Sequence, residues 1–131
     1  MMSLNNPLAT VLSRIQNAER LGKRELTTHV NSKVIRAVLQ ILKDEGYIAA
    51  FTETPDKKGA SLTITLCGRL NKTGVITPKF NVKTEDFVQF EKRYLPAKDF
   101  GALILTTNKG VITHKKAKEE NVGGKLIAYV Y

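Results

Sequence analysis

The sequence predicts an α+β fold, in which an N-terminal α-β-α-β-β lobe is packed against a mainly β C-terminal lobe with short helices. The prediction rests on helical periodicity in the first half and on short extended segments separated by Gly, Pro and Asn turns. We place the lobe boundary in the basic turn GRLNKTG, so the lobes span residues 1–70 and 71–131. A chain of 131 residues can bury roughly two-thirds of its unfolded surface, so its core needs no disulfide or metal.

The first lobe is expected to contain two amphipathic helices. Asn5-Asn6-Pro7 starts the first helix. An Asn side chain accepts a hydrogen bond from one of the N–H groups that have no partner within the helix, and Pro, which has no N–H, suits the first helical position. Asn31-Ser32 caps the second, and the helices end at Gly22 and at Gly46, the latter as a left-handed cap. Their apolar residues recur at helical spacing: Leu8, Val11, Leu12 and Ile15, then Val34, Ile35, Val38, Ile41 and Leu42.

Three strands complete the first lobe. They are predicted at residues 25–30, 47–54 and 60–67, with a turn at 55–59. Alternating apolar residues in the third strand indicate a sheet that is covered on one face, so we expect both helices to cover that face. Cys67 lies in this apolar strand, and we expect it to be a small buried core residue.

The C-terminal lobe is predicted to be built from shorter elements. They are a basic turn at 68–74, an extended piece at 75–80 interrupted by Pro78, a helix at 85–94, a strand at 102–107, a turn at 108–110, a strand at 111–112, a helix capped by Thr113 and ending at Glu120, a turn at Gly123-Gly124 and a strand at 125–131. His114 follows the helix cap, so we expect it to be an exposed residue of the first helical turn.

The chain is strongly basic, with a formal net charge of +9. Residues 1–69 carry ten Lys/Arg and six Asp/Glu, and residues 70–131 carry eleven and six. Because the excess is spread over both halves, it predicts a polyanionic partner for the whole molecule, nucleic acid before an anionic membrane surface. Solubility alone is the alternative explanation.

Residues typical of catalytic or metal sites are sparse. The two His are far apart in the sequence, no Cys or carboxylate cluster has metal-ligand spacing, and neither a GxSxG turn nor a P-loop occurs. The paired carboxylates at Asp44-Glu45 and Glu119-Glu120 are expected to be solvated on helix surfaces. We therefore expect no enzyme activity, cofactor, metal or small-molecule substrate. The lone Cys67, the absence of a long apolar stretch and the lack of a signal-peptide pattern predict a cytoplasmic protein without a membrane partner.

The segment GALILTTNKGVITHKKAK, residues 101–118, is the main candidate binding surface. Its strand ends in short hydrogen-bonding side chains beside positive charge and glycines: Thr106, Thr107, Asn108, Lys109, Gly110, Lys115 and Lys116, followed by Gly123, Gly124 and Lys125. Such side chains suit bases and 2′-hydroxyls, lysines suit phosphates, and glycines let a sugar-phosphate backbone come close. The alternative is an ordinary turn in which Gly110 only supplies a positive φ.

The polar sides of the two N-terminal helices form a second candidate surface. Its residues are Arg14, Asn17, Lys33 and Arg36, and a solvated helix face is the alternative. The turn that carries Arg69 and Lys72 is a third basic patch.

Over essentially its whole length, the chain resembles the small-subunit ribosomal protein eight family. The segment 101–118 fits the family signature at Gly101, Ile104, Leu105, Thr106, Thr107, Gly110, Val111, Ile112, Ala117 and Lys118. NPLATVLSRIQNAERLGKRE and SKVIRAVLQILKDEGYI are similar to the family's N-terminal half. GRLNKTGVITPKF, RYLPAKDFGALIL and GGKLIAYVY resemble its archaeal and eukaryotic cytosolic branch, and the ending looks archaeal more than eukaryotic.

The resemblance implies a structural protein of the small ribosomal subunit. Such a protein binds a helix in the central domain of small-subunit rRNA, lies beside other small-subunit proteins and supports assembly of that domain. The resemblance places RNA contacts at Thr106, Thr107 and Asn108, at the glycine turn Gly123-Gly124, at Lys125 where bacterial members often have a carboxylate, and on the helices near Arg14, Asn17 and Lys33.

Two other classes remain open from the residues alone. A winged-helix DNA-binding regulator would use the second helix, with Lys33, Arg36 and Gln40, for recognition. A membrane-surface protein is the third class, although neither helix combines a rich Lys/Arg face with bulky aromatics.

Overall fold

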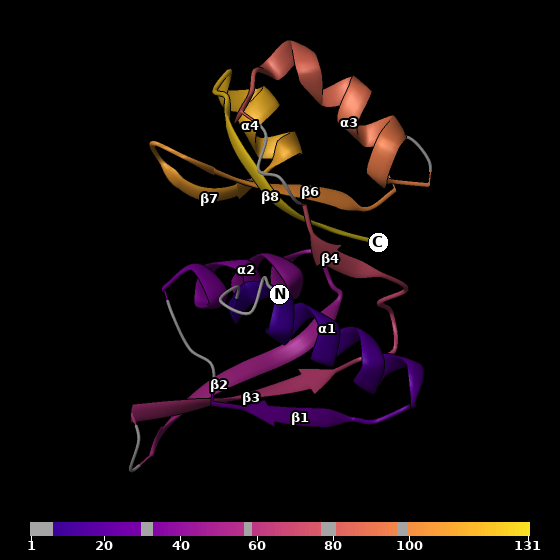
Figure 1. Ribbon diagram of the computed structural model, residues 1–131, viewed down its shortest axis with the longest axis vertical. Helices are drawn as coiled ribbons and strands as arrows, with labels where there is room; N and C mark the ends of the chain where they lie inside the picture. Colours follow the sequence, from indigo (N-terminus) through magenta and orange to yellow (C-terminus); the bar gives the residue numbers. More distant parts are fainter. Residues whose placement is uncertain (1–6, 30–32, 57–58, 77–80, 97–99) are drawn as a thin grey trace, which may run out of the picture. The chain divides into compact units, whose positions relative to one another are not determined.

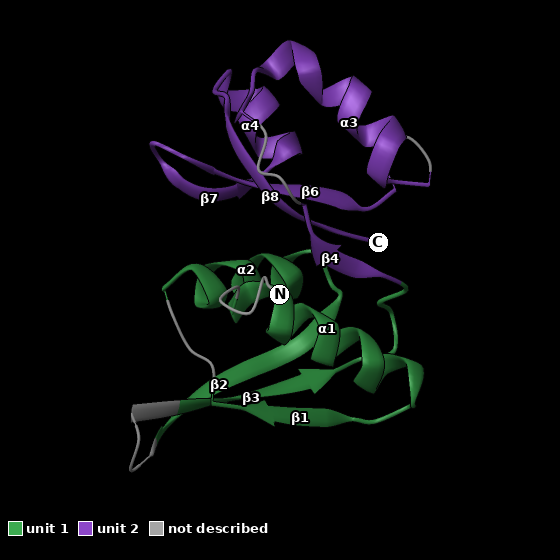
Figure 2. Ribbon diagram, in the orientation of Figure 1, with its two compact units in different colours: residues 1–71 green, residues 72–131 purple. Residues whose placement is uncertain are grey.

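The computed structural model describes residues 7–29, 33–56, 59–76, 81–96 and 100–131. The chain divides into two compact units, residues 1–71 and 72–131 (Figure 2). Both contain helices and antiparallel sheets, which confirms the α+β class. The predicted caps at Asn5-Asn6 and Asn31-Ser32, and the interruption at Pro78, lie outside the described residues.

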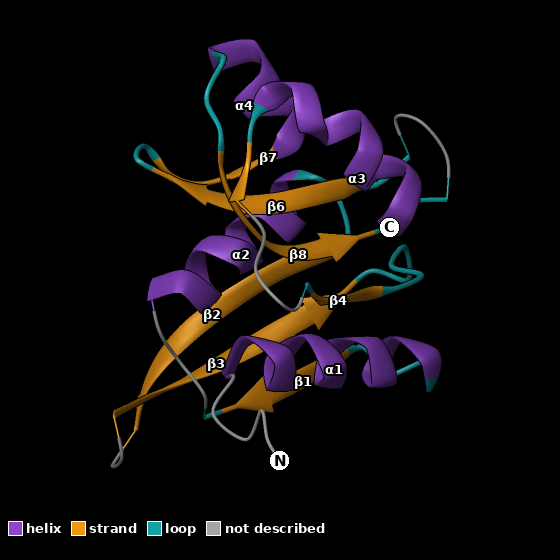
Figure 3. Cartoon of the chain, turned by 45° about the horizontal axis from the view of Figure 1, so that its top comes forward, coloured by secondary structure: helices purple, strands orange, loops and turns teal. Residues whose placement is uncertain are grey.

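Unit 1 has the predicted α-β-α-β-β order. Its elements are α1 (Pro7–Arg20), β1 (Glu25–Thr28), α2 (Lys33–Asp44), β2 (Ile48–Asp56) and β3 (Gly59–Leu66). The strands form an antiparallel sheet in the order β1-β3-β2, and both helices lie on one face of it (Figures 1 and 3). Because β2 and β3 pair as far as Asp56 and Gly59, the predicted turn at 55–59 was too long.

The core of unit 1 follows the helical pattern closely. The predicted apolar residues of α1 are buried, as are Ile35, Val38, Ile41 and Leu42 of α2. Val34 is the exception at 46% exposed, and Leu39 is buried in addition. Gly46 has a φ of 84°, which confirms the left-handed cap, and Tyr47 N–H closes the helix on Leu42 O at 2.8 Å.

Cys67 is exposed, so the prediction of a buried core residue was wrong. Residue 67 is offset by one position from the alternation that buries Leu62, Ile64 and Leu66, and it follows the end of β3 at Leu66. Its Sγ lies 3.4 Å from Gly46 O and donates a weak hydrogen bond to it.

Unit 2 is built around β8 (Gly124–Val130). Its other elements are β4 (Thr73–Val75), β5 (Asn81–Val82), the short 3₁₀ helix η1 (Thr84–Asp86), α3 (Phe87–Tyr94), β6 (Ala102–Thr107), β7 (Gly110–Thr113) and α4 (His114–Glu120). The antiparallel order is β4-β8-β6-β7, and β5 also pairs with β8. Figure 1 shows α3 and α4 on the same face of this sheet. Between helices and sheet, Phe87, Leu105 and Leu126 form the centre of the core.

The predictions for β6, β7, α4 and β8 hold to within one or two residues. Thr73 and Gly74 were assigned to a turn, but they lie in β4 opposite Val130 and Tyr129. Strand β5 was not predicted as a separate strand. Among the described strands, both pair with β8 alone, which lies more than 40 residues later in the chain, so no local pattern identifies them.

Candidate nucleic-acid interface

The signature segment forms a tight hairpin between β6 and β7. Thr107 pairs with Gly110, so Asn108 and Lys109 are the two connecting residues. The Thr107 hydroxyl accepts a hydrogen bond from Lys109 N–H at 3.0 Å and donates one to Gly110 O at 3.0 Å. Gly110 has a φ of 110°. Thr107 and Gly110 therefore shape the turn, while the side chain of Asn108 is exposed at its tip.

Next to this hairpin, three exposed polar side chains form a row across the sheet. Thr106 of β6 is directly opposite Lys125 of β8, and Lys125 is directly opposite Asn81 of β5. Residues directly opposite each other on neighbouring strands share one face of a sheet. The polar row, defined as Asn81, Lys125 and Thr106, thus presents an amide, an ammonium and a hydroxyl side by side. None of these side chains forms a hydrogen bond or ion pair with another described residue.

Asn81 was not predicted as a binding residue. It lies in a two-residue strand that pairs with β8, so its place in the polar row depends on a register that is remote in sequence. An isolated Asn before an apolar residue is the only local signal, and it is equally typical of a turn.

The glycines at 123 and 124 were expected to leave room for an RNA backbone, but the structure shows a reason within the chain itself. A Cβ atom added to Gly124 would lie 2.2 Å from Thr106 O and 2.8 Å from Thr107 Cγ2. A Cβ added to Gly123 would lie 2.5 Å from Val82 O. These glycines allow β8 to approach β5 and β6, and this close approach is what aligns the polar row.

The lysines of the signature segment differ in their surroundings. Lys109 pairs with Glu120 at 3.4 Å on the surface. Lys115 and Lys116 are exposed in the first turn of α4 and form no ion pair with a described residue. The start of this helix is confirmed as predicted, because the Thr113 hydroxyl accepts a hydrogen bond from Lys116 N–H at 3.3 Å. Two cations are therefore held outward at a capped helix end.

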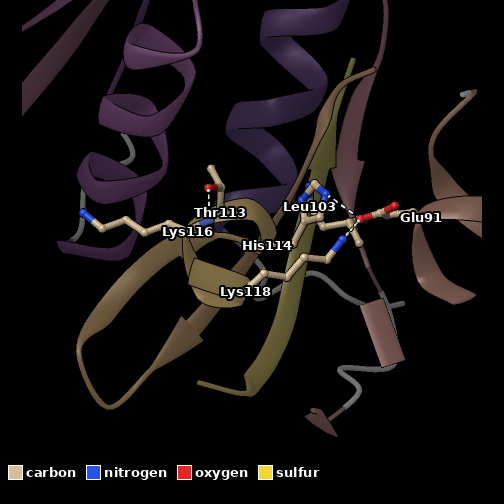
Figure 4. A network of polar contacts seen from close by, with 6 residues as sticks. All are labelled: Glu91, Leu103, Thr113, His114, Lys116 and Lys118. Carbon is tan, nitrogen blue, oxygen red and sulfur yellow. Dashed lines mark hydrogen bonds and ion pairs between the residues drawn. The ribbon is translucent and has the colours of Figure 1, made fainter. Parts of the chain in front are cut away.

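His114 is buried at 1% exposure, so the prediction of an exposed first-turn residue was wrong. Its Nδ1 accepts a hydrogen bond from Leu103 N–H at 3.0 Å, and its Nε2 lies 2.9 Å from Glu91 Oε1 (Figure 4). The same carboxylate oxygen lies 2.7 Å from Lys118 Nζ. Burial lowers the pKa of His114, although the Glu91 carboxylate acts in the opposite direction; the charges of Lys118 and Lys115 lower it further.

In unit 1, α1 and β1 border a shallow hollow. Arg14 and Asn17 line it together with Leu21, Lys23 and Thr27. Lys23 is a second cation that sequence reasoning missed. Lys33 is exposed at the start of α2 and does not line this hollow, and Arg36 pairs with Glu53 at 3.1 Å. The predicted helix surface is thus divided, with Arg14 and Asn17 together and Lys33 apart.

The described residues contain no group of three or more His, Cys, Asp or Glu side chains placed to hold a metal ion. None of the described helices has the length and apolar character needed to span a membrane. The carboxylates of Asp44, Glu45, Glu119 and Glu120 are exposed on their helix ends, as predicted.

Residues 6–131 match the family described as Ribosomal protein S8. The match includes both units and the whole signature segment. Proteins of this family are structural components of the small ribosomal subunit, where they bind rRNA and neighbouring ribosomal proteins, and the family is not one of enzymes. The winged-helix interpretation is not favoured by this match. The chain therefore belongs to the ribosomal protein S8 family and is a structural, rRNA-binding protein of the small ribosomal subunit.

Proposed function

We propose that this protein binds a helix in the central domain of small-subunit rRNA and supports the folding and assembly of that domain, and that the polar row of unit 2 is its main RNA contact. The observation that carries the site proposal is the register that sets Thr106 beside Lys125. It joins a neutral hydrogen-bonding group, on one exposed face, to a cation that has no ion pair with a described residue.

This chemistry suits A-form RNA. Its deep major groove is closed to side chains, so proteins contact the shallow minor groove and irregular sites. The hydroxyl of Thr106 and the amides of Asn81 and Asn108 can each donate and accept hydrogen bonds to base edges and 2′-hydroxyls. Lys125 and the outward cations Lys115 and Lys116 neutralise phosphates. Lys109 attracts phosphate less strongly, because its ammonium forms an ion pair with Glu120.

Three other residues, two in the hairpin and one in β8, support this surface from within. Thr107 and Gly110 set the hairpin, and Gly124 sets the spacing between β6 and β8. We propose that Thr107 also reaches the RNA through the one lone pair that its two intrachain hydrogen bonds leave open. Gly110 and Gly123 are both exposed.

Unit 1 holds adjacent RNA backbone in this proposal. Arg14 and Lys23 line one hollow with the Asn17 amide, whose oxygen accepts a hydrogen bond from Arg20 at 3.4 Å. Lys33 is a separate phosphate contact at the start of α2. With RNA bound by residues 1–70 and by residues 71–131, the two lobes stabilise the relative geometry of separate RNA segments.

We further propose that the chain belongs to the archaeal and eukaryotic cytosolic branch, and within it to the archaeal group. Lys125 supports this assignment, because bacterial members often have a carboxylate after the glycine turn. The ending GGKLIAYVY supports the archaeal group.

A salt titration of RNA binding tests the lysine assignments. K116M and K125M should each reduce the magnitude of the negative slope of log K against log salt by roughly 0.7–0.9, which corresponds to one lost phosphate contact. K92M removes an exposed lysine of α3 outside the polar row and should leave the slope unchanged. An unchanged slope and affinity for both K116M and K125M would refute the charge assignment.

Substitution of the two threonines separates contact from folding. T106V should weaken RNA binding by about 1–3 kcal/mol while unfolding stays as in the parent, because its hydroxyl has no hydrogen-bond partner among the described residues. T107V should weaken binding and also stability, because it removes the hydrogen bonds of the turn. Binding unchanged in T106V would remove the polar row from the interface.

The choice of RNA over DNA is tested by competition. A central-domain rRNA helix should displace labelled RNA at far lower concentration than duplex DNA at matched salt. In a sedimentation profile the protein should travel with small ribosomal subunits. Equal competition by duplex DNA would favour the winged-helix alternative.

A further inference from the structure

The last basic residue of the signature, Lys118, has different surroundings from its neighbours. Lys115 and Lys116 face outward without an ion pair to a described residue, whereas Lys118 Nζ lies 2.7 Å from Glu91 Oε1. The Glu91 side chain is only 9% exposed and that of Lys118 is 40% exposed. The lysine stem therefore crosses from the surface to a carboxylate that has little contact with water.

His114 completes this arrangement. Its Nδ1 accepts a hydrogen bond from Leu103 N–H, so the neutral ring carries its proton on Nε2. The Nε2–H group then donates a hydrogen bond to Glu91. Strand β7 ends at Thr113, where its last pair is with Ile104. The next N–H on β6, that of Leu103, has no further β7 residue to pair with, and the His114 ring takes the place of the missing strand partner.

The network joins three elements of unit 2. Glu91 comes from α3, His114 and Lys118 are one turn apart on α4, and Leu103 comes from β6 (Figure 4). Ala117 is fully buried on the same helix. The N-terminal turn of α4, which carries Lys115 and Lys116, is therefore fixed by contacts made on the opposite side of the helix.

We propose that Lys118 is a positioning residue and not an RNA ligand: it is the counter-ion of the buried Glu91, and through Glu91 and His114 it holds α4 so that Lys115 and Lys116 face the RNA. The part concerning RNA rests on the proposed function above. This counter-ion role accounts for the basic residue at the end of the signature, whose ammonium contacts a buried carboxylate.

The two partners of the ion pair should respond differently to removal. K118M leaves the carboxylate of Glu91 in a nearly dry site with only His114 as its partner. E91Q leaves Lys118, which can turn toward water. We therefore expect K118M to raise the unfolding equilibrium constant at least about fivefold, E91Q to raise it less, and E91Q/K118M to lie nearer the parent than K118M does.

RNA binding distinguishes positioning from direct contact. K118M should weaken binding with the salt slope unchanged, and adding E91Q should restore much of the affinity. K115M should lower the slope by roughly 0.7–0.9, and E91Q should not restore it. K118R, which keeps the charge, should bind like the parent. A lowered slope in K118M that E91Q does not restore would make Lys118 a phosphate ligand and overturn the proposal.

The imidazole signals of His114 give a second readout, because the ring lies beside the charges of the ion pair. The charges near the ring are Glu91 from α3 and Lys115 and Lys118 from α4. Removing Lys118 should raise the pKa of His114 in an NMR titration, because Glu91 then has only His114 as a cationic partner. An unchanged titration in a folded K118M protein would overturn the proposal.

If K118M does not fold, E91Q/K118M carries the test. A double variant that folds and binds RNA like the parent supports the counter-ion role. A double variant that fails to fold overturns this role. Urea unfolding and the His114 titration need no RNA, so they remain readable if the parent does not bind the rRNA helix and the proposed function fails.

Discussion

Substitution of Gly124 by Ala should separate β8 from β6 at the centre of the candidate site. The added Cβ would lie 2.2 Å from Thr106 O, and real Cβ atoms essentially never approach closer than 3.0 Å, so one strand must move by about 0.8 Å. The backbone of Gly124 does not have a positive φ, so lack of space is the whole penalty. Overpacking costs about 1–3 kcal/mol and a weakened ladder hydrogen bond about 0.5–1.5 kcal/mol. Together they give an expected loss of about 1.5–4.5 kcal/mol.

Urea unfolding followed by circular dichroism measures this loss. With an m-value near 2 kcal/mol/M, the midpoint of G124A should fall by roughly 1–2 M. G74A is the matched control on the other side of β8, because its nearest neighbours are atoms of the Tyr129 side chain, the closest at 3.1 Å, which can shift by a few tenths of an ångström. A G124A midpoint equal to that of G74A would refute the steric argument. RNA binding should fall in G124A, because Thr106 and Lys125 no longer face the ligand together.

Two further predictions concern the start of α4. Burial lowers the pKa of His114 below its ordinary value of 6.5, so on acidification the unfolded chain takes up a proton at His114 before the folded chain does. The free energy of unfolding should therefore fall as the pH drops below about 6.5, by up to about 1.4 kcal/mol per pH unit. In urea unfolding, H114N should lose less free energy of unfolding between pH 7 and pH 5 than the parent does. The control is H29N, which replaces an exposed His, and an equally small loss in H29N would contradict the assignment to His114. T113A should lose about 1 kcal/mol through the missing cap, whereas T113S should retain it; equal midpoints for the two variants would contradict the cap.

The local pattern predicted most of the elements because each carries its own signal. Helical spacing identified the buried faces of α1 and α2, and Thr113 identified the start of α4. Gly46 identified a helix end, because few other residues adopt its positive φ. Such signals depend on residues that are close in sequence, and they predicted these elements correctly.

The errors occurred where a residue's surroundings come from a distant segment. Cys67 is the exception, because its exposure has a local reason: it lies one residue past the end of β3 and off the alternation of the buried residues. His114 follows a helix cap, yet its ring replaces a strand partner for Leu103 and contacts Glu91, which is 23 positions earlier in the sequence. Strands β4 and β5 pair with β8, which lies more than 40 residues later in the chain.

The candidate site shows the same division. The sequence by itself determined that Thr106, Thr107, Asn108 and the nearby lysines lie at the end of a basic, polar hairpin, because turn chemistry and charge are properties of neighbouring residues. Only the tertiary structure decided which of these side chains face outward. Strand register set Thr106 beside Lys125 and Asn81, and Gly124 allowed the close packing of β8 on β6. The buried carboxylate of Glu91 pairs with the ammonium of Lys118, whereas Lys115 and Lys116 have no ion pair with a described residue. The physical reason is that cross-strand pairing and the desolvation of a charge both depend on partners that are far away in sequence.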